Sequence, residues 1–105
     1  MNNISNLKTS SNVKGVLTIK LNRPKERNAI SNAVLQELAV TLETTLSNDD
    51  IRCVVITGNQ DFFAAGADIK ELSRLNTVDV LHNVRYQYWD KIKNYPKPII
   101  AAVNG

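Results

Sequence analysis

The chain has 105 residues, 43% of them hydrophobic and 22% charged, which is the size and composition of one small globular domain. Thirteen Lys and Arg against ten Asp and Glu give a net charge of +3, and the basic residues are scattered. This argues against a nucleic-acid-binding arm and favours a small phosphate-bearing ligand. The single cysteine, Cys53, excludes an internal disulfide and a cysteine-based metal cluster. No apolar run reaches membrane-spanning length and the first residues resemble no secretion signal, so we expect a cytoplasmic protein without a membrane partner.

The first 21 residues are predicted to form a β-hairpin. Ile4 to Thr9 is a weak strand candidate, Ser10 to Gly15 is turn-like, and Val16 to Leu21 alternates apolar and polar side chains as a half-buried strand does. Pro24 ends the second strand, because proline lacks a backbone donor and restricts the residue before it. A loop is expected from there through Asn28.

A helix is predicted over residues 31–47, followed by a strand over 52–58. Ser31 is a suitable N-cap, and Asn48 to Asp50 ends the helix. The strand is a continuous apolar run closed by Gly58. The apolar positions of the helix recur at intervals of three and four residues and predict one buried stripe: Val34, Leu35, Leu38, Ala39, Leu42 and Leu46.

Small residues then join the strand to a further helix, within a loop predicted over 62–70. Residues 64–67 read Ala-Ala-Gly-Ala, and the segment from Asp68 to Leu75 has helical character. Small side chains let a ligand approach the main chain, and the first N–H groups of a helix lack internal partners. Free donors beside the positive end of a helix dipole suit a developing oxyanion. Taken alone, the same residues fit an ordinary tight loop better.

A second long helix is predicted over residues 77–95, and a short strand over 98–103. The only histidine, His82, has no partners at metal-ligand spacing, so no metal site is expected. One face of the helix is apolar and contains Leu81, Val84, Tyr88, Ile92 and Tyr95. Core packing or the lining of an acyl pocket is expected of the aromatic residues Tyr86, Tyr88, Trp89 and Tyr95. Strands and helices therefore alternate, which indicates an α/β fold with two rough repeats of one supersecondary unit.

Four motifs stand in one order along the chain: Asn22-Arg23-Pro24-Lys25 with Asn28-Ala29, VVITG at 54–58, FFAAGAD at 62–68 and KPIIAAVNG at 97–105. Together they resemble the crotonase family, specifically the enoyl-CoA hydratases, from about Gly15 onward. The resemblance implies the N-terminal portion of a crotonase-type spiral of strand-strand-helix repeats. The chain is most similar to the hydratases of phenylacetate breakdown that act on 2,3-dehydroadipyl-CoA, with short-chain hydratases of fatty acid oxidation nearly as similar.

The resemblance also implies an acyl-CoA thioester as the substrate, with no further cofactor, and two backbone N–H groups that stabilise its enolate. Ala67 matches the first of these donors, at the helix start noted above. Ala65 matches the residue whose carbonyl contacts adenine. Lys25 matches a basic position at the nucleotide end of CoA, where an ammonium offsets phosphate charge. The substrate-lining loop is expected to continue through Asp68, Ile69 and Lys70.

The remaining hydratase groups are a glycine that supplies the second N–H and two glutamates that do the acid–base work, and the resemblance places all three beyond Gly105. We therefore expect a truncated hydratase that binds acyl-CoA but does not hydrate it alone. The alternatives are a non-catalytic product or interaction module, or another reaction of the superfamily such as isomerisation or thioester hydrolysis. The family forms trimers or dimers of trimers, and the isolated chain is expected to aggregate or oligomerise through the exposed strand at 99–103.

Overall fold

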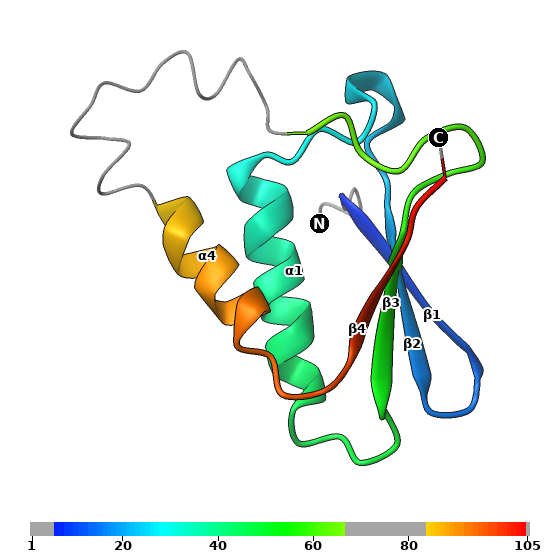
Figure 1. Ribbon diagram of the computed structural model, residues 1–105, viewed down its shortest axis with the longest axis vertical. Helices are drawn as coiled ribbons and strands as arrows, with labels where there is room; N and C mark the ends of the chain where they lie inside the picture. The colour runs from blue at the N-terminus through cyan, green and yellow to red at the C-terminus, as the bar shows by residue number, and fades with distance from the viewer. Residues whose placement is uncertain (1–5, 67–83, 105) are drawn as a thin grey trace, which may run out of the picture.

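Four strands form one sheet, and two helices lie against one of its faces (Figure 1). The computed structural model describes residues 6–66 and 84–104. Along the chain its elements are β1 (Leu7–Val13), β2 (Val16–Leu21), the short 3-10 helix η1 (Pro24–Glu26), α1 (Asn32–Thr45), β3 (Cys53–Thr57), α4 (Val84–Lys93) and β4 (Ile99–Ala102).

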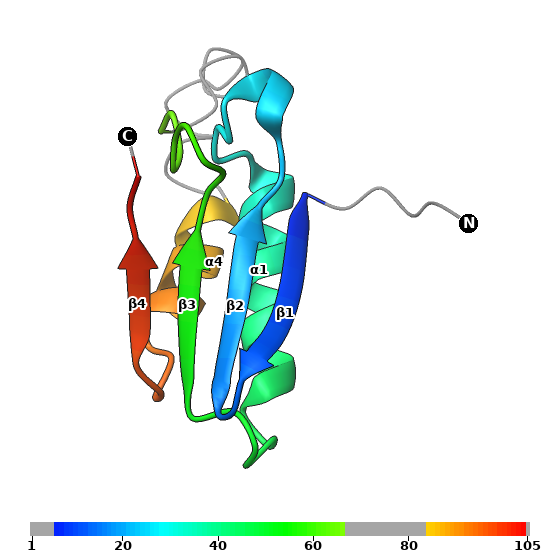
Figure 2. The same ribbon diagram turned by 90° about the vertical axis from the view of Figure 1, so that its right-hand side faces the viewer.

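The strand order is β1-β2-β3-β4, with an antiparallel hairpin at one edge and parallel pairs in the rest of the sheet. Because β2, β3 and β4 run the same way, their carboxyl ends meet at one edge, at the top of Figure 2. The α/β fold predicted from the sequence is confirmed, with α1 as the crossover between β2 and β3.

The hairpin differs from the prediction in where it turns. Its first strand runs from Leu7 to Val13 instead of ending at Thr9, and the turn is confined to Lys14 and Gly15. Gly15 has φ +83°, a conformation that glycine adopts without a side-chain clash. The polar residues predicted as a turn lie in an exposed edge strand, where the pairing is irregular between Ser10 and Val13. An edge strand accepts polar residues, so the pattern was misleading there.

The core lies between α1 and the sheet face that it covers. Ser31 caps the helix as predicted, since its Oγ accepts a hydrogen bond of 3.2 Å from the Val34 N–H. The predicted stripe is buried except for Leu46, which is 45% exposed because the helix ends at Thr45. On the sheet side the buried residues alternate along the strands, as they do where one face is covered: Leu7, Leu17, Ile19, Leu21 and Val54.

Helix α4 packs against α1, and residues 77–83 of its predicted range lie outside the described part of the chain. Ile92 and the following Tyr95 pack against the core, as the apolar face predicted. Four aromatic residues were expected to pack in the core or to line an acyl pocket; Tyr86 is 59% exposed and Trp89 is 46% exposed, so core packing is excluded for these two, and lining of an acyl pocket stays a prediction. These two residues are three positions apart and therefore lie on the same face of α4.

Lys97, which precedes β4, joins several segments at the end of the sheet opposite the carboxyl ends of β2, β3 and β4. Its Nζ donates hydrogen bonds to the carbonyls of Thr45 at 2.6 Å, Ile51 at 2.7 Å and Asn48 at 3.0 Å. The Thr45 hydroxyl is also hydrogen-bonded to the hydroxyl of Tyr95. One lysine therefore joins the end of α1, the approach to β3 and the start of β4.

Within the described residues, neither helix is long and apolar enough to cross a membrane.

Candidate functional site

Three segments that follow parallel strands lie at the carboxyl edge of the sheet (Figure 2). They are residues 22–31 after β2, 58–66 after β3 and 103–104 after β4. In open α/β sheets this edge is the usual place for a ligand, because loops from neighbouring strands converge there. The sequence motifs at 22–29 and 62–66 both lie on it.

The segment after β3 folds back tightly on the end of its own strand. A Cβ on Gly58 would lie 2.2 Å from the Phe62 carbonyl oxygen and 2.5 Å from the Phe63 Cα, so only glycine fits. Asn59 closes the turn: its Oδ1 accepts from the N–H groups of Asp61 at 2.8 Å and Phe62 at 3.0 Å. This turn sets the direction in which the chain enters residues 62–66.

The segment after β2 turns through two consecutive residues in the left-handed region. Arg27 has φ +52° and Asn28 has φ +58°, which costs about 1 kcal/mol or more for a residue with a side chain, although asparagine tolerates it best. The turn is held by the Asn28 N–H to the Arg23 carbonyl at 2.8 Å and by Arg23 Nη1 to the Ala29 carbonyl at 2.7 Å. Strained conformations of this kind persist only where surrounding contacts fix them.

Three hydrogen bonds join the two segments. The Asn28 Nδ2 donates to the Phe63 carbonyl at 3.0 Å, the Ala65 N–H donates to the Arg27 carbonyl at 3.0 Å, and the Ile30 N–H donates to the Gly66 carbonyl at 2.7 Å. On the other side, the Asn104 side-chain amide donates to the Gln60 carbonyl. Residues 23–30 and 62–66 thus form one cross-linked surface, which we call the loop platform.

The structure brings two of the predicted site residues onto the loop platform. Lys25 lies in η1 and is exposed, and Ala65 is exposed with its N–H bonded to Arg27, two residues after Lys25. The predicted roles of both in binding CoA stay predictions. The other four predicted site residues lie outside the described part of the chain: Ala67, Asp68, Ile69 and Lys70.

The charge of η1 and its flanks favours an anionic ligand. Arg23, Lys25 and Arg27 lie within five residues, against the single carboxylate of Glu26. Lys25 and Arg27 are exposed, so both cations are accessible from solvent. Ammonium and guanidinium groups bind phosphate through charge-assisted hydrogen bonds.

Sequence reasoning missed two residues that shape this site, Asn28 and Gly58. Asn28 was part of a quoted motif without a role, and Gly58 was interpreted only as the end of a strand. An asparagine shortly after a proline-interrupted strand is a signal for a left-handed turn, since its side chain tolerates positive φ. Its second partner, the Phe63 carbonyl, is 35 positions away and has no local signal.

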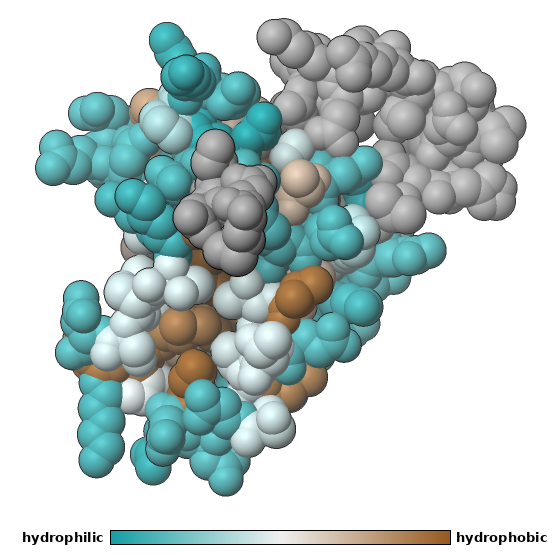
Figure 3. Space-filling view, turned by 180° about the vertical axis from the view of Figure 1, so that it is seen from behind, coloured by the Kyte–Doolittle hydropathy of each residue, from teal (hydrophilic) through white to brown (hydrophobic). Residues whose placement is uncertain are grey.

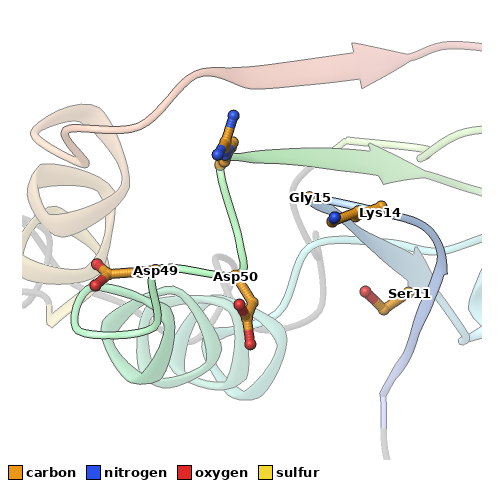
Figure 4. A pocket seen from close by; sticks show the side chains of 6 residues that line it. Ser11, Lys14, Gly15, Asp49 and Asp50 are labelled. Carbon is orange, nitrogen blue, oxygen red and sulfur yellow. The ribbon is translucent and has the colours of Figure 1, made fainter.

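Two hollows elsewhere are less suited to a ligand. A cleft of about 510 Å³ lies at the opposite end of β2 and β3 (Figure 4), lined by Ser11, Lys14, Gly15, Asp49, Asp50 and Arg52. The labelled side chains there point in different directions instead of converging, and both charge signs are mixed. The face seen from behind shows apolar side chains among hydrophilic ones (Figure 3). A second, open groove is lined by residues of β1 and α1. No group of three metal-ligating side chains occurs among the described residues.

Comparison with known proteins gives a consistent result. The family model described as enoyl-CoA hydratase/isomerase matches residues 11–105. The 2,3-dehydroadipyl-CoA hydratase of Escherichia coli (strain K12) is 46% identical over 90 residues, which cover 86% of this chain and 35% of that protein. The mitochondrial enoyl-CoA hydratase of Pongo abelii is 40% identical over 87 residues, covering 83% and 30%.

Solved structures agree with the sequence matches. An enoyl-CoA hydratase subunit from Geobacillus kaustophilus HTA426 superposes with a TM-score of 0.89 at 31% identity, covering 99% of this chain and 40% of that chain. The enoyl-CoA hydratase from Bacillus anthracis has a TM-score of 0.84 at 34% identity, covering 96% and 40%. The fold is therefore that of these hydratases, and the chain spans about a third of the length of the curated relatives that it matches.

Proposed function

Because this chain belongs to the enoyl-CoA hydratase/isomerase family, we propose that it forms the acyl-CoA-binding, N-terminal part of an enoyl-CoA hydratase. The observation that carries this proposal is the loop platform, a cross-linked and locally basic surface at the carboxyl edge of the parallel strands. The relatives named as hydratases favour hydration over the isomerase and thioester hydrolase alternatives.

In the proposed complex the nucleotide end of CoA lies against η1, with Lys25 beside its phosphates and the Ala65 carbonyl beside adenine. The thioester carbonyl reaches the Ala67 N–H, which shares the negative charge of the enolate as water adds across the double bond. A preorganised donor of this kind contributes about 3 kcal/mol to transition-state stabilisation. The platform orients the ligand, and the donor acts on the reacting carbonyl.

Hydration also needs a base for water and an acid for the α-carbon. The carboxylates on the described parts of the platform and its turns, Glu26 and Asp61, are both exposed, and the family resemblance assigns the acid–base work to glutamates beyond Gly105. We therefore propose that residues 1–105 bind the thioester and that its hydration also needs those glutamates.

The first prediction is binding without turnover. Calorimetric titration of the purified chain is expected to show micromolar to millimolar binding of butyryl-CoA, tighter than that of free CoA because free CoA ends in a thiol and lacks the thioester carbonyl that the oxyanion donor binds. Crotonyl-CoA is expected to keep its enoyl absorbance on incubation with the chain. Clear hydration of crotonyl-CoA would contradict the assignment of the acid–base groups, and no binding of either ligand would contradict the proposal as a whole.

The second prediction concerns Lys25. Lys25→Met is expected to weaken the binding of CoA and butyryl-CoA alike by about fivefold, because one exposed charge-assisted contact to phosphate is worth about 1 kcal/mol. The loss should shrink at high salt, where screening weakens the pair. The matched control is Lys14→Met, an exposed lysine at the opposite end of the sheet. Equal losses of CoA affinity in the two variants would mean that the nucleotide end of CoA does not bind beside Lys25.

A further inference from the structure

Asn28 is the most buried polar residue at the carboxyl edge of the sheet, with 1% of its surface exposed. It has φ +58° and follows Arg27 at φ +52°, so the chain adopts two uncommon conformations in succession to place it. Burial and strain together at one polar side chain need a compensating set of contacts. The oxygen and the nitrogen of the Asn28 side-chain amide each have a hydrogen-bond partner.

The side chain of Asn28 joins two segments by using its two ends in opposite roles. Its Oδ1 accepts from the Arg23 N–H at 2.7 Å, and its Nδ2 donates to the Phe63 carbonyl at 3.0 Å. These partners fix the orientation of the amide, because a backbone N–H requires an acceptor and a carbonyl requires a donor. Neither an acid nor an alkyl side chain can satisfy both.

The hydrogen bond from Asn28 to Phe63 also affects the residues that follow Phe63, which form the part of the loop platform that faces the proposed ligand. Phe63 is followed by Ala64 and Ala65, whose N–H bonds to the carbonyl of Arg27, the residue next to Asn28. Hydrogen bonds therefore link positions 27 and 28 to positions 65 and 63. Without the amide contact at Phe63, two backbone hydrogen bonds between the described parts of these segments remain, Ala65 N–H to the Arg27 carbonyl and Ile30 N–H to the Gly66 carbonyl.

We propose that Asn28 is the positioning residue that sets where the 62–66 segment lies relative to a bound acyl thioester, an inference that rests on the proposed function. Asn28 does not touch the ligand. It acts through the Phe63 carbonyl, so its loss weakens recognition of the thioester more than recognition of the nucleotide, which η1 binds.

The test compares Asn28→Asp and Asn28→Gly with the wild-type chain. The aspartate keeps the acceptor for Arg23 and loses the donor to Phe63, whereas the glycine relaxes the positive φ and loses both side-chain bonds, so at least one variant should fold. Both are expected to lose the preference for butyryl-CoA over free CoA by about tenfold while still binding CoA. Amide hydrogen exchange at Ala65 and Ile30 should speed up at least tenfold relative to Val54 in β3.

Lys97→Met is the matched control, since it weakens the structure at the opposite end of the sheet and should keep the thioester preference. Variants of Asn28 that keep both the preference and the amide protection would overturn the inference. Variants that lose protection but keep the preference would also overturn it, because Asn28 would then be structural only. A wild-type chain without any thioester preference would instead contradict the proposed function, while exchange at Ala65 would still report whether Asn28 holds the loop.

Discussion

Gly58→Ala is expected to lower the free energy of unfolding by about 3 kcal/mol and the affinity for butyryl-CoA by at least tenfold. The added methyl group would lie 2.2 Å from the Phe62 carbonyl oxygen and 2.6 Å from that of Phe63, and both are backbone atoms that cannot rotate away. Overpacking of a tight site costs about 1–3 kcal/mol. The clash with the added methyl group is relieved only if the 62–66 segment moves away from the end of β3. That shift would break its hydrogen bonds to residues 27–30 and distort the loop platform.

The measurement for Gly58→Ala is urea unfolding followed by circular dichroism, together with a butyryl-CoA titration. Gly15→Ala is the matched glycine control: its φ is +83°, but the atoms nearest to a Cβ there belong to the Arg52 side chain, at 3.7 Å or more. That variant should lose about 1 kcal/mol of stability through its backbone conformation and keep its affinity. Wild-type affinity in Gly58→Ala would show that the close approach at β3 does not shape the site.

Lys97→Met is expected to lower the free energy of unfolding by about 3 kcal/mol without changing ligand selectivity. Its ammonium makes three hydrogen bonds of 2.6–3.0 Å to carbonyls, and hydrogen bonds to charged groups contribute about 1.5–3 kcal/mol each before the cost of ordering the side chain. The positive charge also lies at the C-terminal end of α1, where it favours the helix dipole. Methionine has about the length of the four-carbon stem of lysine and removes all three N–H donors.

Urea unfolding measures this loss directly, with Lys91→Met as the control. Lys91 lies 4.0 Å from the Glu43 carboxylate on the surface, and both side chains are more than half exposed, so its removal should change stability by no more than about 0.5 kcal/mol. Similar small effects for the two lysines would mean that the carbonyls of Thr45, Asn48 and Ile51 exchange the ammonium for water at little cost.

The elements predicted most accurately are those whose local pattern and burial agree. Strand β2 alternates and has one covered face, and α1 combines an N-cap with a regular apolar stripe, so their bounds were close. The edge strand β1 was misplaced because exposure lets it contain Ser and Asn residues typical of turns. The exposure of Tyr86 and Trp89 depends on how much of α4 its neighbour covers, which the helical period does not specify.

The sequence motifs located the candidate site, but they did not predict the contacts that hold its segments together. Lys25 and Ala65 were proposed from a family resemblance, and the structure shows them on one platform without testing their roles. What joins their segments is the contact between Asn28 and Phe63, which depends on how β2 and β3 pair across the sheet. Contacts of this separation arise from topology and leave no periodic signal in the sequence.

The central claim, that the carboxyl edge of the sheet binds the acyl-CoA thioester, is tested most directly by mapping butyryl-CoA on the ¹⁵N-labelled chain by NMR. The proposal predicts shifts concentrated at the amides of residues 25–30 and 62–66, and none at residues 11–15 and 49–52 around the cleft at the other end. Shifts confined to that cleft, with the amides of residues 25–30 and 62–66 unchanged, would contradict it.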